Sequence, residues 1–423
     1  MVPGSQLVVT SPLEVLGDRL LFETYQPETA QRLLWASDGT ANGTQVISNP
    51  ENRVFNFGSI NAQVNNQFLF SSFGRELWVT DGTQAGTQVL QELAVARMLP
   101  VTLAVGERVF LEASDRVRGY ELWVSDGSGP GTRIVKDLRP GLTSSAPNLL
   151  QAFKGEIYFT AKGLQGEQLW ASDGTEAGTR RVKDISPLSG LVSQVSSVVN
   201  DRLLFVTRTP ETGMELWSTD GSEAGTQLIR DINPGPGSSL IAQMTRLGDR
   251  IVFSATGPDG TEPWVSDGTA AGTVQLKDIA QDSSVSGFSP LVWPSPGRPL
   301  GGALPLEPVM RPNGSAPQDF ILVGEALYFT ATRDGTSRDL WRTDGTPEGT
   351  LLAASALELG GSRIENLTRL GDDLIFSIDL SEGSTSQIWR LPLGATRATA
   401  TDPLGAPLIS LGNDSQAALI QSP

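Results

Sequence analysis

One stretch decides the fold: Glu121-Leu122-Trp123-Val124-Ser125-Asp126-Gly127-Ser128-Gly129-Pro130-Gly131-Thr132. Its pattern, Leu-Trp-x-x-Asp-Gly-Thr-x-x-Gly-Thr, recurs along most of the chain. Pro263 replaces the leucine of one copy, and a degenerate copy at Trp389 lacks the Asp-Gly pair. A ninth tryptophan, Trp293, lies outside the series. The seven clear copies are centred on Trp35, Trp78, Trp123, Trp170, Trp217, Trp264 and Trp341.

The spacing of these tryptophans gives the period of the repeat. Successive copies lie 43 to 48 residues apart, apart from one interval of 77 between Trp264 and Trp341. Periods of about 40–50 residues are typical of propeller blades or of helical repeats. The long interval equals one period plus an insertion of roughly 30 residues.

Residue chemistry favours strands over helices. Within one unit, Gln243–Leu247 and Arg250–Ala255 are short β-prone runs separated by Gly248-Asp249, a pair suited to a tight hairpin turn. Runs such as Leu203–Val206 are apolar at every position, which indicates strands buried on both faces. Glycine or proline interrupts every gap, and no run is long enough for a helix.

The units therefore predict an all-β protein, a single β-propeller of eight four-stranded blades over residues 1–423. Seven or nine blades remain alternatives, because residues 405–423 resemble the first two strands of another unit. We also expect the lone strand near Leu7–Thr10 to complete the last blade, whose fourth strand is poorly marked around Thr396–Asp402.

The units resemble the bacterial ELWxxDGT repeat family. Seven of the eight match the motif closely, with departures at Pro263, at Ser128 and Ser222, and in the eighth unit. The family is found mostly in secreted or surface-attached bacterial proteins. The resemblance therefore implies a fold and an extracellular or cell-surface location more than an activity.

Composition narrows the classes of function. The formal net charge is −16, which opposes binding to nucleic acids and to anionic membranes. The chain has no cysteine and no histidine, so Ser-His-Asp and Cys-His catalysis and histidine-based zinc sites are excluded. No run of about 20 apolar residues is present to span a membrane. The start at Met1–Ser5 lacks the pattern of a signal peptide, and we expect such a peptide to have been removed.

The seven Asp-Gly-Thr/Ser loops join the third and fourth strands of their units. Aspartate accepts hydrogen bonds from backbone N–H groups two residues on, and glycine supplies positive φ, so these residues are predicted to be structural turn residues. Calcium is the competing interpretation, but each loop offers one carboxylate, whereas Ca²⁺ takes about six to eight oxygens. We therefore predict no cofactor and no metal. The turn residues are Asp38, Asp81, Asp126, Asp173, Asp220, Asp267 and Asp344.

Charged residues recur at two further positions of the repeat, and at both positions we interpret them as structural rather than functional. The pairs Lys136-Asp137, Lys183-Asp184 and Lys277-Asp278 are predicted to protect an exposed outer strand from aggregation. Arginines follow the first hairpin of several units and are predicted to be solvated there, namely Arg108, Arg202 and Arg250.

The insertion at 284–319, between repeats six and seven, is rich in proline and glycine. Loops of this length in compact domains are usually functional or disordered. An exposed tryptophan offers a platform for a sugar or for an apolar group of a partner, and packing against the loops of the repeats is the alternative. The candidate binding residues are Trp293, Arg298, Met310 and Arg311.

These observations favour a non-catalytic extracellular or cell-surface propeller for recognition or scaffolding, with another surface protein or a glycan as partner. A carbohydrate-binding adhesin is one alternative. A glycoside hydrolase or lyase is another, but it needs two carboxylates at a set separation, which a linear sequence does not reveal. We predict that the chain is not an enzyme.

Overall fold

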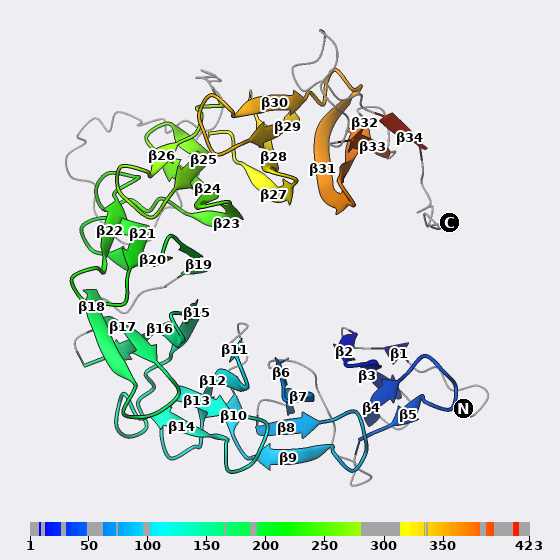
Figure 1. Cartoon of the computed structure of the whole chain (residues 1–423), viewed down its shortest axis with the longest axis vertical. Coiled ribbons are helices and arrows are strands. Elements are labelled where there is room, and N and C mark those ends of the chain that lie inside the picture. The colour runs from blue at the N-terminus through cyan, green and yellow to red at the C-terminus, as the bar shows by residue number, and fades with distance from the viewer. Residues whose placement is uncertain are drawn as a thin grey trace, which may run out of the picture. The chain divides into compact units, whose positions relative to one another are not determined.

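The computed structural model describes residues 8–9, 13–26, 31–48, 62–72, 75–95, 102–164, 166–186, 193–280, 314–333, 335, 337–380, 386–392 and 409–413. These residues form β-strands and loops without any helix (Figure 1). No helix in this part of the chain has the length and apolar character that a membrane crossing needs. The all-β prediction is confirmed.

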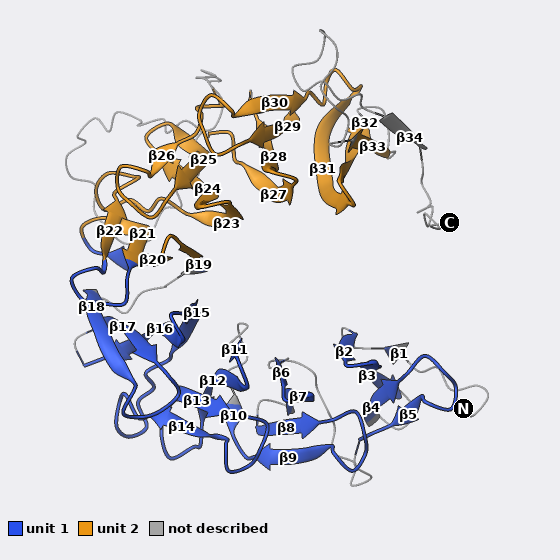
Figure 2. Ribbon diagram, viewed as in Figure 1, with its two compact units in different colours: residues 1–196, 207–210, 219–226 blue, residues 197–206, 211–218, 227–423 orange. Residues whose placement is uncertain are grey.

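The chain divides into two compact units (Figure 2). Unit 1 comprises Met1–Ser196, Thr207–Pro210 and Thr219–Thr226, and unit 2 comprises Ser197–Val206, Glu211–Ser218 and Gln227–Pro423. Repeats one to four lie in unit 1 and repeats six to eight in unit 2, while repeat five contributes residues to both.

Each repeat forms an antiparallel sheet whose four main strands pair in chain order, and in repeats one and three a further short strand also pairs with the second main strand. The strands of repeats one to four are β1 (Val8–Val9), β2 (Glu14–Leu16), β3 (Arg19–Gln26), β4 (Gln31–Ser37), β5 (Gln45–Val46), β6 (Ala62–Val64), β7 (Gln67–Ser72), β8 (Glu76–Thr80), β9 (Gln88–Gln91), β10 (Ala94–Val95), β11 (Thr102–Val105), β12 (Arg108–Ser114), β13 (Glu121–Ser125), β14 (Arg133–Lys136), β15 (Asn148–Phe153), β16 (Glu156–Gly163), β17 (Gly166–Ser172) and β18 (Arg180–Ser186).

Repeats five to eight follow the same order. Their strands are β19 (Ser193–Val199), β20 (Arg202–Thr209), β21 (Gly213–Thr219), β22 (Gln227–Arg230), β23 (Ala242–Leu247), β24 (Arg250–Gly257), β25 (Gly260–Ser266), β26 (Val274–Gln275), β27 (Gln318–Val323), β28 (Ala326–Thr332), β29 (Arg338–Thr343), β30 (Leu351–Ala354), β31 (Gly361–Leu370), β32 (Asp373–Leu380), β33 (Ser386–Pro392) and β34 (Ile409–Asn413).

The second strand of a repeat is buried on both faces, as the apolar runs predicted. On β12, Val109 and Leu111 pack in one cluster with Leu69 of repeat two, while Phe110 packs in another with Ile157 of repeat four. The four residues Leu203–Val206 on β20 are almost fully buried. Each such side chain contributes about 1.5–3 kcal/mol of transfer free energy, so neighbouring sheets within a unit depend on one another for stability.

The prediction for the N-terminal strand is wrong. β1 pairs with β3 of its own repeat, with Val8 opposite Tyr25. The fourth strand of repeat eight is β34, which pairs with β33 through Trp389 and Ser410. Residues Thr396–Asp402, which were expected to supply that strand, lie outside the described residues.

The sheets of repeats seven and eight are joined by one parallel pairing between β29 and β31, at Arg338 and Arg363. Their eight strands are therefore one continuous sheet. No other pair of repeats in the described part of the chain is joined in this way.

Buried glutamates hold the connectors between repeats. Glu121 accepts hydrogen bonds from the backbone N–H groups of Leu138 (3.1 Å) and Ser145 (3.0 Å) and from the Ser145 hydroxyl (2.6 Å). Glu262 makes the same three bonds with Ile279 (3.1 Å) and Ser315 (2.9 and 2.6 Å). The two anchored residues are 7 positions apart in the first case and 36 in the second. The insertion therefore lies within a connector whose two ends are bonded to Glu262 in the same way as the ends of the shorter connector are bonded to Glu121.

This arrangement predicts that the insertion can be removed without loss of the fold. Replacing residues 280–314 by the six-residue segment 139–144 should leave the free energy of unfolding unchanged or raise it by about 1 kcal/mol, because a shorter loop costs less closure entropy. Chemical denaturation of both proteins measures the difference. A loss of more than about 2 kcal/mol would show that the insertion packs on the repeats.

Candidate binding site at the loop end of the repeats

We call the end of each sheet that carries the hairpin between strands one and two, and the Asp-Gly loop between strands three and four, the loop end. In repeat three, Asp126 Oδ1 accepts hydrogen bonds from the backbone N–H (2.9 Å) and hydroxyl (2.6 Å) of Ser128. The Ser128 hydroxyl in turn accepts one from Gly131 N–H (3.0 Å), and the Thr132 hydroxyl donates to Ser128 O (2.7 Å). The same network closes the loops at Asp38, Asp81, Asp173, Asp220, Asp267 and Asp344.

The network explains why the motif ends in Gly-Thr. A Cβ atom built on Gly131 would lie 1.9 Å from Asp126 Oδ1. At the glycine that precedes the last threonine in each of the seven loops, the nearest aspartate atom is 1.9 to 2.2 Å from such a Cβ. The carboxylate therefore occupies the space that any side chain would need.

The hydroxyl bond also fixes the charge of these loops. The pKa values of four of these aspartates are lowered, chiefly by the side-chain hydrogen bond from the Ser or Thr two residues on. They are Asp38, Asp126, Asp173 and Asp344. These carboxylates are therefore ionised at neutral pH. No three side chains of the metal-ligating types gather into one group among the residues that the structure describes.

Two of the arginines predicted to be solvated after the first hairpin, Arg108 and Arg250, instead hold the next repeat. The third, Arg202, is half-buried, and its Nη1 has no hydrogen-bond partner in the described structure. Arg108 donates to the Asp173 carbonyl (2.7 Å), and Arg133 donates to the adjacent Gly174 carbonyl (2.8 Å). Arg19 and Arg250 donate in the same way to the carbonyls of Gly82 (2.6 Å) and Gly345 (2.9 Å). Sequence reasoning missed these bonds because a backbone carbonyl in another repeat has no sequence signature.

The cations of the fourth strands also bind the following repeat. Lys136 Nζ donates to Thr179 O (3.0 Å) and Lys183 Nζ to Thr226 O (2.6 Å). The acceptor is each time the carbonyl of the last threonine of the next Asp-Gly loop. The equivalent bonds of repeats five and six are Arg230–Thr273 (2.8 Å) and Lys277–Thr350 (3.1 Å). These residues therefore join repeats, a role beyond the predicted protection of an outer edge.

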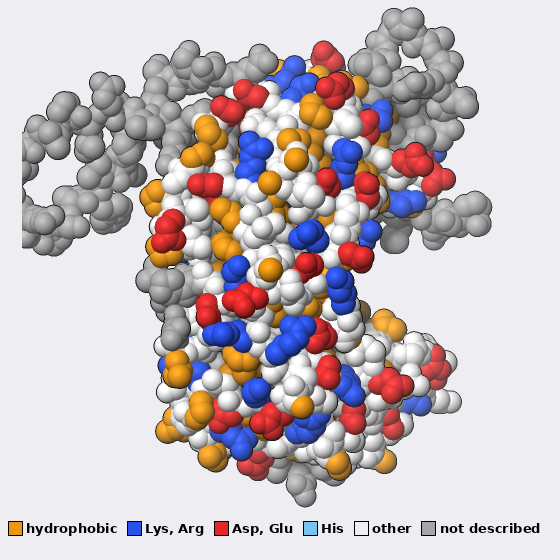
Figure 3. Space-filling view, turned by 60° about the vertical axis from the view of Figure 1, so that its left-hand side comes forward, with side chains coloured by type: hydrophobic (Ala, Val, Ile, Leu, Met, Phe, Trp, Pro, Cys, Tyr) orange, Lys and Arg blue, Asp and Glu red, His pale blue; other side chains and the backbone are white. Residues whose placement is uncertain are grey.

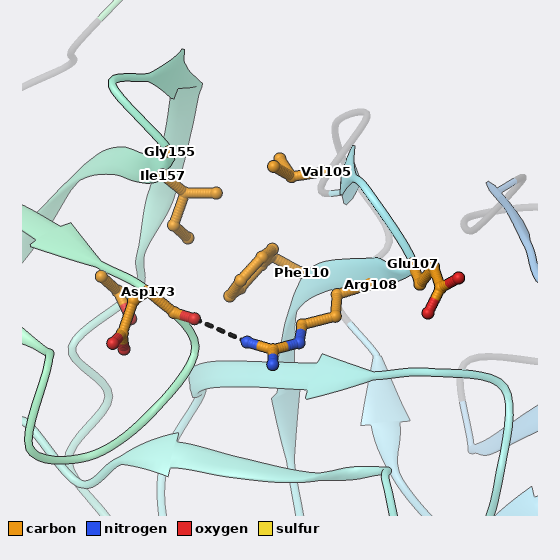
Figure 4. Close-up of a pocket in the computed structure, with 8 residues that line it drawn as sticks. Val105, Glu107, Arg108, Phe110, Gly155, Ile157 and Asp173 are labelled. Atoms are coloured by element: carbon orange, nitrogen blue, oxygen red, sulfur yellow. Dashed lines mark hydrogen bonds between the residues drawn. The ribbon is translucent and has the colours of Figure 1, made fainter.

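A hollow of about 280 Å³ lies between repeats three and four at the loop end (Figure 4). Figure 4 shows Arg108 reaching toward the Asp173 backbone, with Phe110 and Ile157 beside the same space. Val105, Phe110 and Ile157 give it apolar walls. Glu107 and Asp173 lie at its rim, where the Glu107 side chain points away from the space (Figure 4) and Asp173 Oδ1 accepts hydrogen bonds from Thr175. The lining residues are Val105, Glu107, Arg108, Phe110, Gly155, Ile157, Ser172 and Asp173.

Carboxylates recur in the hairpins of the loop end. Each hairpin turn has two residues, and in five repeats the first is a glycine with positive φ, which suits a type II′ turn and leaves the second position free for an exposed side chain. In the other three repeats both turn residues have positive φ, which suits a type I′ turn. In six of the eight repeats that second residue is acidic and exposed. These residues are Asp18, Glu107, Asp201, Asp249, Glu325 and Asp372.

The predicted binding residues fall outside the part of the chain that the structure describes. They are Trp293, Arg298, Met310 and Arg311, and all of positions 284–313 of the insertion fall outside it as well. Residues 314–319 belong to the connector and the start of β27, so the C-terminal boundary predicted for the insertion, 319, is too late. The sequence does mark some of the residues that line the hollow. An acidic residue followed by arginine recurs after the first strand of several repeats, as in Glu107-Arg108, and Asp-Gly recurs after the third strand, as in Asp173-Gly174.

No family model and no curated protein matches the chain. Similar solved structures include a puromycin hydrolase (12% identity, TM-score 0.33, 89% of this chain and 60% of that chain) and a prolyl endopeptidase (12%, 0.38, 92% and 55%). TolB from Acinetobacter baumannii is similar over 60% of this chain and 76% of that chain, at 11% identity and a TM-score of 0.28. The chain thus spans less than two thirds of the length of the hydrolase and the endopeptidase.

These comparisons contradict the function expected from the sequence. The similar structures named here are described as a puromycin hydrolase, prolyl endopeptidases and TolB, rather than as adhesins, lectins or surface scaffolds. The predicted extracellular scaffold or adhesion role, with its glycan-binding and glycosidase alternatives, is therefore not retained.

Proposed function

We propose that the eight repeats form one eight-bladed β-propeller whose loop end binds a cationic polypeptide. The observation that carries the proposal is the hollow between repeats three and four, whose apolar walls are bordered by the exposed acidic residues Glu107 and Asp173. A lysine side chain fits this chemistry, because its methylene stem packs on apolar surface while its ammonium group needs a counter-charge.

The distribution of charge supports the loop end as the binding surface. The hairpin carboxylates recur there, and the ionised Asp-Gly loops lie beside them. The nearby arginines Arg19, Arg108 and Arg250 donate to backbone carbonyls and hold repeats together. On the face shown in Figure 3, by contrast, acidic and basic side chains are interspersed. A cationic ligand is therefore attracted to the loop end, with an association that depends on salt.

The remaining features of the proposal follow from the sequence. We propose an exported bacterial protein, as the ELWxxDGT resemblance implies. We also propose that the chain binds its ligand without chemical conversion, since it lacks the histidine and cysteine that most often act as general base and nucleophile. Nucleic acids and anionic membranes are not its partners, because its net charge repels them.

Binding of a defined peptide tests the proposal. A fluorescent peptide of alternating lysine and glycine should bind at low salt, and the same peptide with acetylated lysines should not. Glu107→Gln should weaken binding about 2- to 5-fold, as expected for one exposed ion pair worth 0.2–1 kcal/mol. Fluorescence anisotropy at two salt concentrations measures both effects.

The matched control is Glu211→Gln. Glu211 is an equally exposed glutamate, but it lies in the loop between β20 and β21, at the opposite end of its sheet. This variant should bind like the unmodified protein. Equal binding of the acetylated peptide, or equal weakening by both variants, would refute the loop-end site.

A further inference from the structure

Repeat one pairs a half-buried arginine of its third strand with a buried glutamate of its second strand. Arg32, two residues before Leu34 on β4, forms an ion pair with Glu23 on β3, whose side chain is fully buried. Glu23 is the residue that pairs with Leu34 across the two strands. The arginine and its counter-ion therefore come from neighbouring strands of one sheet.

Repeat seven keeps the arginine of this pair and lacks the glutamate. Arg338 lies two residues before Leu340 on β29, and Thr330 on β28 is the residue paired with Leu340. Thr330 thus occupies the position that Glu23 has in repeat one. Repeat two also has an arginine at this position, Arg75, but that residue is exposed, and repeat four has a glutamate, Glu167. The other repeats have neutral residues there, namely Tyr120, Met214, Thr261 and Ser386.

Arg338 is a buried cation whose hydrogen-bond acceptors are neutral. Its residue is 8% exposed. Nη1 donates to the Ala316 carbonyl (3.1 Å), the Thr330 carbonyl (3.4 Å) and the Thr330 hydroxyl (3.3 Å). Nε is buried without an acceptor in the described structure. A buried charge without a counter-ion in contact is unfavourable.

A second arginine lies beside it. Arg363 is the residue paired with Arg338 where β29 meets β31, and its side chain is 54% exposed. Like charges at directly paired positions repel each other. The two nearby carboxylates have other donors, since Glu365 contacts Arg363 Nε (3.1 Å) and Asp319 accepts from the Thr330 hydroxyl (2.9 Å). Burial, followed by Arg363, lowers the pKa of Arg338.

We propose that Arg338 and Arg363 bind the carboxylate of a small organic acid. The ligand carboxylate takes the place that the Glu23 side chain has in repeat one, with Arg338 at its base and the more exposed Arg363 at its entrance. A guanidinium group matches a carboxylate through parallel N–H···O bonds, which favours this ligand class. The site lies within unit 2 and takes a ligand of opposite charge, so it is independent of the proposed peptide binding.

Ligand-dependent stability tests the site. Sodium acetate should raise the Tm of the unmodified protein above its value in sodium chloride of equal ionic strength, because a ligand that binds only the folded state stabilises it. Arg363→Gln should weaken the acetate effect about 10-fold in concentration. Arg369→Gln is the matched control on the same strand, since Arg369 donates to Gly371 O and contacts Asp372 instead. It should retain the full effect.

A variant that supplies the missing glutamate makes the test specific. Thr330→Glu should raise the Tm in chloride and abolish the response to acetate, because its own carboxylate fills the site. The inference fails if acetate has no effect on the unmodified protein or an equal effect on Arg363→Gln and Arg369→Gln. A response to phosphate but not to acetate would also overturn the carboxylate assignment. If Thr330→Glu does not fold, the two arginine variants decide the question alone.

Discussion

Replacing Gly131 by alanine is expected to lower the free energy of unfolding by about 2–4 kcal/mol, from steric strain and lost hydrogen bonds. The new Cβ would lie 1.9 Å from Asp126 Oδ1, inside the hydrogen-bonded loop. Asp126 must move, and its two bonds to Ser128 break with it. Because Gly131 does not have positive φ, the backbone itself tolerates alanine, and the effect isolates the clash.

The same loop contains its own control. Gly129 lies two residues earlier, a Cβ built on it meets no atom within 4 Å, and its φ is not positive. Gly129→Ala should therefore change stability by less than about 0.5 kcal/mol. Urea denaturation of both variants, followed by tryptophan fluorescence, measures the contrast. Equal stability of the two variants would mean that the Asp-Gly network contributes little to the fold.

Much of the local structure could be predicted because its partners are close in sequence. Asp126 and Ser128 are two residues apart, and the strand pattern around Trp123 repeats with little change. The Asp-Gly motif therefore encodes its own loop. The antiparallel order within each repeat follows from short turns, which leave little choice of pairing.

The bonds between repeats could not be predicted in the same way. Lys136 and Thr179 are 43 residues apart, and the acceptor is a backbone carbonyl, which every residue has. The recurring charged residues therefore predict a solvated edge, whereas in the structure Lys136 joins two repeats. The exposed hairpin acids were visible in the sequence, but their place beside the Asp-Gly loops needed the strand order.

A third kind of information lies in how repeats differ. Repeat one pairs Glu23 with Arg32, repeat three keeps a glutamate at Glu112, and repeat seven keeps only Arg338. Arg338 is buried and Glu112 is half-buried, and neither has the ion-pair partner of repeat one. Such differences become meaningful only once the structure shows which positions face each other.

Replacing Glu112 by glutamine is expected to stabilise the protein at alkaline pH and not at acidic pH. Glu112 lies on β12 on the same face as Phe110, toward repeat four, and receives no hydrogen bond from the residues that the structure describes. Burial, followed by the charge of Glu121, raises its pKa to about 7, and Lys162 opposes the shift. In repeat three, Tyr120 stands where repeat one has the arginine partner.

The sign follows from the raised pKa. The folded protein holds the Glu112 proton more tightly than the unfolded chain does, so this contribution to stability is complete below the unfolded pKa of 4.5 and is lost as the pH rises through about 7. Glutamine cannot ionise and avoids the loss. Glu112→Gln should therefore gain about 1–3 kcal/mol over the unmodified protein between pH 4.5 and pH 8.

Restoring the pair of repeat one gives an independent check on the cause. Tyr120→Arg supplies a guanidinium group at the position from which Arg32 contacts Glu23, so Glu112 should ionise at little cost and the loss of stability toward alkaline pH should shrink. In this background Glu112→Gln should become destabilising at pH 8, because it then removes the counter-ion of a half-buried arginine. Urea denaturation of the four proteins at pH 4.5, 6 and 8 separates these effects. Parallel curves for the unmodified protein and Glu112→Gln would show that the carboxylate is already satisfied and that the missing arginine of repeat three has no energetic consequence.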